Sequence, residues 1–383
     1  MQPSVYCDYN ATAPLRDEVK TAIINAMDKV ANPSSVHAHG REARKMLEDA
    51  REAVAAGVGA CREDITFTSG GTEGACLVLN GARKAASDLR LIVSSIEHDA
   101  VLAQADDALV VPVTRAGVVD LDALKDILDN WSDDQKRPFL SLMAVNNETG
   151  VIQPLAEAVE LIHAAGGLAH TDAVQAIGKI PFSILDADVD YISFSSHKIG
   201  GPQGVGAVYI KPGAPCAAML TGGGQETSRR AGTQNLLGAV GFDAAIKKAL
   251  ADMEGFQALS KCRDDMELRL QHEAGVTIYG KEANRVANTS CFGLKGFRAE
   301  TQVMALDLAG FSISAGSACS SGKVKPSHVI KAMGEDDDMS LCAVRASFGW
   351  QSAPEDFERF ADAWISAAER AGALKRQVKE SAR

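Results

Sequence analysis

Between residues 65 and 251, short apolar segments with strand character alternate with segments of helical period. Strands are expected at 65–68, 90–95, 109–113, 139–146, 168–171, 189–194 and 205–210, and helices near 99–105, 120–130, 154–165 and 235–251. Parallel strands need a crossover between them, and a helix usually supplies it. The alternation therefore predicts an α/β fold with a mostly parallel sheet that has helices on both faces.

The pattern changes after about residue 255. A long amphipathic helix is expected at 256–274, and short strands at 276–279 and 288–294 follow it. A helix at 299–309, a Ser/Gly/Ala-rich loop at 314–322 and a final helix at 354–372 complete the chain. We therefore expect a large domain over 13–255 and a smaller α+β domain formed by 1–12 and 256–383.

Charge and composition exclude several kinds of partner. The 383 residues carry a formal net charge of −11, which disfavours binding to nucleic acid or to an anionic membrane surface. No apolar run is long enough to span a bilayer and no signal segment opens the chain, so the expected location is the cytoplasm. The eight cysteines are scattered without CxxC or zinc spacing, which predicts reduced thiols and no metal site.

Lys198 directly follows an apolar strand in the segment YISFSSHKIG. Open α/β sheets bind their ligands at the carboxyl ends of the strands. Ser195 and His197 beside the lysine can donate hydrogen bonds to an anion. An amine among anion donors indicates a phosphorylated carbonyl cofactor held as a Schiff base. Taken alone, a lysine in this position is more often a surface residue after a strand, and the groups described below favour the cofactor instead.

Asp172 and Gln175 lie at the end of the preceding strand, one crossover before Lys198. A carboxylate there could pair with a pyridinium nitrogen and keep the ring an effective electron sink. Gln175 could donate to a phenolic oxygen of the same ring. The alternative for Asp172 is a helix N-cap.

Further polar groups follow other strands. Gly71 and Thr72, in SGGTE, open a helix whose N-terminus suits a phosphate, although the P-loop spacing is absent. His98 could stack on an aromatic cofactor and move protons, or be a structural histidine. Asn147 and Arg345 suit recognition of a carboxylate, although Arg345 could instead form a surface ion pair.

Cys319 stands apart from the other seven cysteines. It lies in SAGSACSSG, where the neighbours are small and polar. Such surroundings are poor for a core cysteine and typical of a mobile thiol that solvent can reach. We therefore expect Cys319 to be the reactive cysteine.

Together these segments resemble the cysteine desulfurases of the NifS/IscS type, in the class V aminotransferase group of fold-type I pyridoxal-phosphate enzymes. The resemblance runs nearly end to end and follows one order of motifs: DYNATAP, NPSSVHAHG, FTSGGTE, EHDAV, VNNETGVIQP, HTDAVQAIGK, SFSSHKIGGPQGVGAVYI, GGGQE, RAGTQN, SAGSACSSG and VRASFG. Gly71 departs from the alanine common in the family's phosphate loop, but Thr72 and the helix start remain.

The resemblance implies a role for each matching position. Lys198 would carry pyridoxal 5'-phosphate, Asp172 would pair with the ring nitrogen, Gln175 would bind the ring oxygen and His98 would stack on the ring. The phosphate would be held by Gly71, Thr72, Ser195 and His197, and by Thr233 from the other subunit of a homodimer. Asn147 and Arg345 would bind the substrate carboxylate, and Cys319 would receive the sulfur.

The implied reaction converts L-cysteine to L-alanine and leaves a persulfide on Cys319. A sulfur-acceptor protein, such as an iron–sulfur scaffold, would then take the sulfur for cluster assembly or another thiolation. Selenocysteine lyase and class V aminotransferase activities are the enzymatic alternatives, and a transaminase would have no use for Cys319. A non-catalytic scaffold is a third alternative, against which the presence of Lys198 and Asp172 counts.

Overall fold

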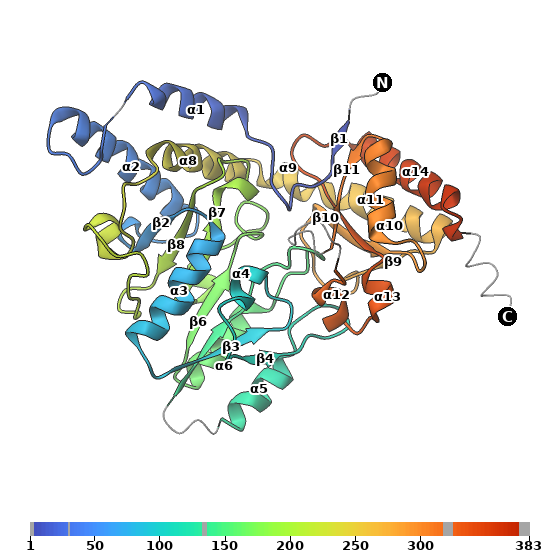
Figure 1. Ribbon diagram of the computed structural model, residues 1–383, viewed down its shortest axis with the longest axis horizontal. Helices are drawn as coiled ribbons and strands as arrows, with labels where there is room; N and C mark the ends of the chain where they lie inside the picture. Colours follow the sequence, from blue (N-terminus) through green and yellow to red (C-terminus); the bar gives the residue numbers. More distant parts are fainter. Residues whose placement is uncertain (1–3, 30, 132–135, 317–324, 375–383) are drawn as a thin grey trace.

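The computed structural model describes residues 4–29, 31–131, 136–316 and 325–374. Its largest sheet has seven strands in the order β2–β8–β7–β6–β5–β3–β4 (Figure 1). Neighbours from β4 to β7 run parallel, whereas β8 is antiparallel to both β7 and β2. The strands are β2 (Ile65–Thr68), β3 (Leu89–Ser94), β4 (Leu109–Val111), β5 (Arg137–Ser141), β6 (Leu168–Asp172), β7 (Tyr191–Ser195) and β8 (Gly206–Ile210). The predicted α/β fold with a mostly parallel sheet is therefore confirmed.

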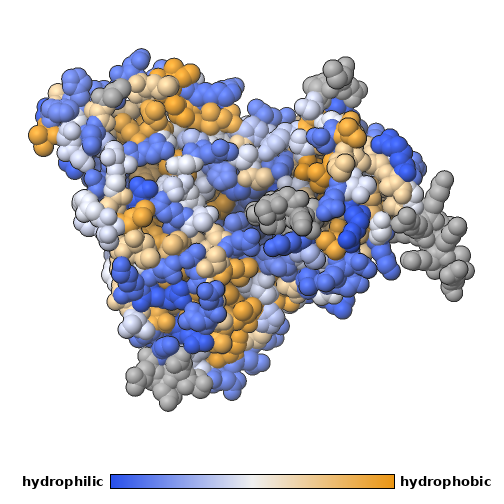
Figure 2. All heavy atoms as spheres, in the orientation of Figure 1, coloured by the Kyte–Doolittle hydropathy of each residue, from blue (hydrophilic) through white to orange (hydrophobic). Residues whose placement is uncertain are grey.

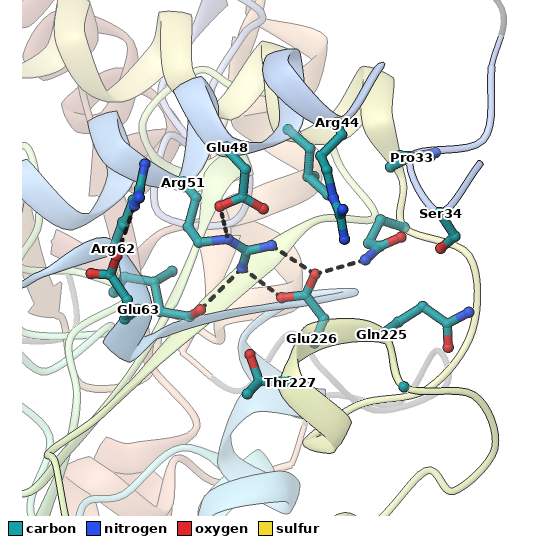
Figure 3. Close-up of a pocket in the computed structure, with 14 residues that line it drawn as sticks. Pro33, Ser34, Arg44, Glu48, Arg51, Arg62, Glu63, Gln225, Glu226 and Thr227 are labelled. Atoms are coloured by element: carbon teal, nitrogen blue, oxygen red, sulfur yellow. Dashed lines mark hydrogen bonds and ion pairs between the residues drawn. The ribbon is translucent and has the colours of Figure 1, made fainter. Parts of the chain in front are cut away.

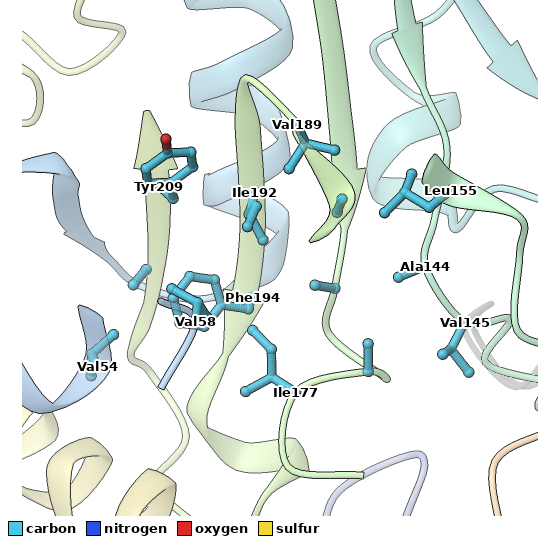
Figure 4. Packing of buried hydrophobic residues seen from close by; sticks show 14 of the residues in the cluster. Val54, Val58, Ala144, Val145, Leu155, Ile177, Val189, Ile192, Phe194 and Tyr209 are labelled. Atoms are coloured by element: carbon cyan, nitrogen blue, oxygen red, sulfur yellow. The ribbon is translucent and has the colours of Figure 1, made fainter. Parts of the chain in front are cut away.

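Helices pack on both faces of this sheet because successive strand residues point to opposite sides. In β7, Ile192 and Phe194 join the core beneath α2, α6 and α8 (Figure 4), whereas Tyr191 packs with residues of α3 and α4 on the other face. α1 lies over α8 (Figure 1). The helices are α1 (Asp17–Met27), α2 (Ala38–Ala56), α3 (Gly71–Ala85), α4 (Asp99–Leu102), α5 (Leu121–Asp129), α6 (Leu155–Ala164), α7 (Ile184–Ala187) and α8 (Leu236–Ala251).

A second core forms around a four-stranded antiparallel sheet in the order β12–β13–β10–β9. Trp364 is fully buried there against Phe292 and Phe297. The N-terminal strand β1 (Val5–Tyr6) pairs in parallel with β11 (Phe311–Ser312), and Val5 joins this same core. The other elements are α9 (Met253–Gln257), α10 (Leu259–Ala274), β9 (Thr277–Ile278), β10 (Thr289–Gly293), α11 (Ala299–Leu308), β12 (Ser314–Ala315), α12 (His328–Ala332), α13 (Asp337–Ser340), β13 (Ala343–Ser347) and α14 (Pro354–Arg370).

The largest differences between the expected elements and the structure concern the strand at 139–146 and the helix at 256–274. The strand expected at 139–146 ends at Ser141, which pairs with Val93 of β3; beyond it, the Met143 N–H donates to the Glu97 carboxylate (2.9 Å) instead of to a strand. The helix expected at 256–274 is broken between α9 and α10. Near that break the Ser260 hydroxyl donates to the carbonyl oxygen of Gln257 (2.8 Å), a local bond that competes with regular helix hydrogen bonding.

The helices within the described residues do not have the character of membrane spans. Among these residues, no helix combines the length and the apolar composition that crossing a bilayer requires.

Candidate active site

Ten of the twelve predicted site residues line one cavity of about 330 Å³. They come from the ends of β6 and β7, from the start of α3, from the segments after β3 and β5, and from β13. They are Gly71, Thr72, His98, Asn147, Asp172, Gln175, Ser195, His197, Lys198 and Arg345. The topology therefore gathers these side chains, and their individual roles remain predictions.

Lys198 lies just past β7 and reaches back to the N-terminal segment. Its Nζ donates to the backbone oxygens of Asn10 (2.6 Å) and Ala11 (2.7 Å). The neighbouring His197 shares a hydrogen bond between its Nδ1 and the Thr12 hydroxyl (2.9 Å). Burial and the nearby Lys198 charge lower the pKa of His197 to about 4, so its imidazole is neutral at pH 7.

Asp172 ends β6 and is buried on the cavity wall. Its Oδ1 accepts a hydrogen bond from the Val174 N–H (2.9 Å). Burial raises the pKa of Asp172, while the charges of His98 and Lys198 oppose that rise. A carboxylate in such a place needs a cationic partner to stay ionised, and a protonated ring nitrogen is one.

Sequence reasoning missed the group of polar residues beneath Gln175. The Gln175 side-chain amide donates to the backbone oxygen of Asn10 (3.0 Å). Lys179 is buried and donates to Asn10 Oδ1 (2.9 Å) and to Gln175 Oε1. Burial, with the Lys198 and Arg345 charges, lowers the pKa of Lys179 well below its ordinary value. Its presence in the HTDAVQAIGK motif was the only sequence signal for this residue.

The opposite end of the cavity is built from α3 and β7. Gly71 begins α3, and a Cβ added there would lie 2.9 Å from Val174 Cγ2, so a side chain at this position would force a neighbour to shift. The first turn of a helix has backbone N–H groups without intrahelical partners and a partial positive charge. With Thr72 and the buried Ser195, this end of the cavity suits an anion.

Arg345 lies inside β13, in the second sheet, and is buried. Its Nη2 pairs with Asp8 (2.8 Å), and its Nη1 donates to the Asn147 backbone oxygen (3.0 Å). Its buried Nε has no hydrogen-bond partner among the residues that the structure describes. Arg345 is therefore a buried cation at the cavity wall, and the alternative of a surface ion pair is wrong.

A buried acid precedes His98. The Glu97 carboxylate accepts from the Ser94 hydroxyl (2.6 Å) and from the Met143 N–H (2.9 Å). Burial raises the pKa of Glu97 to about 8. His98 itself is half-buried, and its Nδ1 accepts from the Ala100 N–H (3.1 Å). That bond leaves Nε2 as the protonated nitrogen of the neutral ring.

Two predicted residues are not in this set. Thr233 is exposed and does not line the cavity within this chain. Cys319 lies outside the described residues. Gly316 does line the cavity, and on the other side of the undescribed stretch Ser327 donates to the buried Glu148 carboxylate (2.6 Å). Burial raises the pKa of Glu148 to about 7, and sequence reasoning gave no sign of this contact.

The donors present fit pyridoxal 5'-phosphate. A lysine amine, a buried carboxylate, a side-chain amide and a histidine ring line the cavity. A helix start with small residues and hydroxyl groups lines the same cavity. This combination provides a partner for the aldehyde, the ring nitrogen, the ring oxygen and the phosphate of that cofactor.

Comparison with known proteins agrees with this donor set. The family model of class-V aminotransferases matches residues 5–360. Cysteine desulfurase IscS of Dictyoglomus turgidum is 37% identical over 371 residues, which cover 93% of this chain and 92% of that protein. A cysteine desulfurase of Cereibacter sphaeroides is 39% identical and covers 92% of both chains.

Solved structures show the same likeness. The X-ray structure of a NifS-like protein from Rickettsia africae has a TM-score of 0.88 and 31% identity, and it covers 96% of this chain and 99% of its own. The chain therefore belongs to the class-V aminotransferase family, among the relatives of the NifS and IscS cysteine desulfurases.

Proposed function

We propose that this chain is a pyridoxal-phosphate-dependent cysteine desulfurase that converts L-cysteine to L-alanine and takes the sulfur onto Cys319 as a persulfide. The observation that carries the proposal is the meeting of Lys198, Asp172 and Arg345 in one cavity. Gly316, three residues before Cys319 in the sequence, lines the same cavity. An amine, an acid and a carboxylate-binding cation at one place suit chemistry at the Cα of an amino acid.

Several residues of this chain would hold the cofactor. Gly71, Thr72, Ser195 and His197 would hold its phosphate, Asp172 its ring nitrogen, Gln175 its ring oxygen and His98 the face of its ring. When bound, pyridoxal 5'-phosphate supplies an electron sink for negative charge at the substrate Cα. Asp172 supports that chemistry because its buried carboxylate favours a protonated ring nitrogen.

Substrate binding and proton transfer fall to other residues. Arg345 and Asn147 would hold the carboxylate of L-cysteine, since the guanidinium is buried and reaches Asn147 directly. Lys198 would remove the Cα proton and return a proton. To act, its amine must exchange its hydrogen bonds to the backbone oxygens of Asn10 and Ala11 for contact with the ligand.

Sulfur transfer needs no external oxidant. The Cys319 thiolate attacks the substrate sulfur, the substrate Cβ–S bond breaks and an S–S bond forms. The substrate sulfur keeps its hydrogen as the terminal S–H of the persulfide, while Cβ takes up the proton that the Cys319 thiol released. The carbon is reduced, the sulfur is oxidised, and L-alanine leaves.

The assembly is also part of the proposal. We place Thr233, which is exposed in a single chain, at the phosphate of a partner subunit in a homodimer. Exposed apolar side chains support such an interface: Ile24 and Met27 lie on α1, where Figure 2 shows apolar residues gathered. Residues 13–255 would form the large domain, and 1–12 with 256–383 the small one. The enzyme would work in the cytoplasm and pass its sulfur to an acceptor such as an iron–sulfur scaffold.

The direct test is incubation of the purified protein with L-cysteine and a thiol, with alanine and sulfide assayed together. A desulfurase gives both in equal amounts. Formation of 3-mercaptopyruvate from cysteine, or of alanine only when an amino-group donor and a keto acid are present, would favour an aminotransferase. Turnover of selenocysteine without turnover of cysteine would favour the lyase.

A further inference from the structure

The strand that leads into the phosphate end of the cavity is an edge strand. β2 pairs only with β8, so its other edge has no neighbouring strand among the described residues. The side chains of Glu226 and Arg51 bind the backbone groups on this edge instead of a strand. The Phe67 N–H donates to Glu226 Oε2 (2.8 Å), and Arg51 Nη1 donates to the Ile65 backbone oxygen (3.0 Å). Unpaired backbone groups at a sheet edge need such partners when they are buried.

Glu226 and Arg51 also pair with each other in a bidentate arrangement (Figure 3). The two N–O distances are 2.6 and 2.9 Å, and the Glu226 side chain is 1% exposed. Gln234 adds a donor to Glu226 Oε1 (3.2 Å), so each carboxylate oxygen accepts two hydrogen bonds. A buried ion pair is stable only when it is satisfied in this way.

The turn that carries Glu226 is strained. Glu226, Thr227 and Ser228 all have positive φ angles, of 47°, 55° and 62°. Non-glycine residues in this region cost energy and persist only where their surroundings hold them. The hydrogen bonds that Arg51 and the Phe67 N–H donate to Glu226 stabilise this conformation.

The same segment reaches the start of α3. Arg230 pairs with Glu73 Oε1 (2.8 Å), and Glu73 Oε2 accepts from the Ser69 N–H (2.7 Å). Gly71 and Thr72 lie between Ser69 and Glu73. The turn at the phosphate end is therefore held through β2 on one side and through Glu73 on the other.

We propose that Glu226, together with Arg51, is a positioning residue for the phosphate-binding turn at Gly71 and Thr72. Glu226 does not line the cofactor cavity, so it acts through β2 and Arg230 and not by contact. The proposal rests on the proposed function in one respect, namely that the anion bound there is the cofactor's phosphate. The affinity of the protein for a phosphorylated ligand should therefore depend on the Arg51–Glu226 ion pair. Its affinity for the same ring without a phosphate should not.

The test compares two ligands on two matched variants. Glu226→Gln removes the charge at nearly constant shape. Glu267→Gln does the same in the Arg285–Glu267 pair, which is also bidentate (2.7 Å twice) and buried, and neither of its residues lines the cavity. Apo protein of each is titrated with pyridoxal 5'-phosphate and with pyridoxal, and Kd is read from the absorbance of the bound ligand.

Glu226→Gln is expected to raise Kd for pyridoxal 5'-phosphate about tenfold or more, which corresponds to at least about 1.4 kcal/mol, and to leave Kd for pyridoxal within about twofold. Glu267→Gln is expected to change neither by more than about twofold. An equal loss for both ligands would show a merely structural role, and no loss would show that the pair positions nothing. If Glu226→Gln does not fold, Arg51→Lys keeps the charge but loses the bidentate geometry, and the same comparison is made with it.

Wild-type binding and a double variant show which part of the proposal holds. If wild-type apo protein binds neither ligand, the proposed function fails, whereas tight wild-type binding with an unaffected Glu226→Gln variant overturns only this inference. Glu226→Gln is also combined with Thr233→Ala. The selective loss should persist in that background, and its disappearance would mean that the pair acts through Thr233 and not through the turn at Gly71.

Discussion

Lys198 Nζ donates to the backbone oxygen of Asn10 at 2.6 Å, although 188 positions separate the two residues in the chain. The Asn10 side chain bonds in turn to Lys179 (2.9 Å) and to the Asn147 backbone oxygen (3.2 Å). The N-terminal segment therefore contacts the predicted cofactor lysine, the amine beneath Gln175 and the predicted substrate site at once. Asn10 connects residues that the sequence places far apart.

Purified protein is expected to be yellow, and borohydride should attach the cofactor covalently to Lys198. The reason is that Lys198 lines the same cavity as Asp172 and His98. Peptide mass spectrometry after reduction identifies the modified lysine. Lys198→Ala should still bind cofactor through the phosphate end, but without turnover. Modification of Lys179 instead would place the cofactor's aldehyde elsewhere.

Asn10→Ala should lower the free energy of unfolding by roughly 1–3 kcal/mol, because the buried Lys179 amine and the Thr289 hydroxyl each lose a partner. Urea denaturation measures the change. Asn32→Ala is the control: the Asn32 side chain is exposed and accepts only from Ser34 N–H among the described residues, so a change under about 0.5 kcal/mol is expected. Equal effects of the two substitutions would contradict the role given to Asn10.

Arg345→Ala should lower kcat/KM for L-cysteine by roughly 10²-fold, since a buried charge that binds a carboxylate is lost. Steady-state kinetics give the value. Arg137→Ala is the matched control, because Arg137 pairs with Asp88 at a place where both side chains are more than 40% exposed. Kinetics of the control should stay within about twofold of wild type. Unchanged kinetics of Arg345→Ala would move the carboxylate site elsewhere.

Glu97 should make the folded protein less stable as the pH rises. Its folded-state pKa, about 8, lies above its ordinary value of 4.5, so the folded state keeps a proton that the unfolded state has lost. The resulting stabilisation is complete below the ordinary pKa and is lost as the pH rises through the folded-state pKa. Glu97→Gln should therefore flatten the fall in Tm between about pH 5 and pH 8, whereas Glu157→Gln, at an exposed position, should leave it unchanged. Parallel pH profiles for wild type and Glu97→Gln would refute this role of Glu97.

Part of this site could be predicted from the sequence because parallel strands bring their carboxyl ends to one edge. Asp172 and Lys198 each follow an apolar strand, and that position alone predicts a shared cavity. Glu226 could not be predicted in the same way. Its function depends on a contact with Arg51, 175 positions away, and on the free edge of β2, which local sequence does not reveal.

Lys179 illustrates the same limit. A lysine four positions after Gln175 looks like an exposed helix residue, and only the fold of the N-terminal segment over it shows that it is buried. The break between α9 and α10 lies beside a hydroxyl-to-carbonyl bond from Ser260 to Gln257, a local feature that a hydrophobic pattern does not show.

The most direct test of the persulfide mechanism is the release of alanine by Cys319→Ser. A hydroxyl cannot accept sulfur as a thiolate does, because it stays protonated at neutral pH and is a poor nucleophile toward sulfur. The variant should keep its yellow colour and bind L-cysteine, yet release no alanine and carry no persulfide. Cys61→Ser, at an exposed cysteine, should behave as wild type. Release of alanine from L-cysteine by Cys319→Ser at the wild-type rate would contradict the persulfide mechanism.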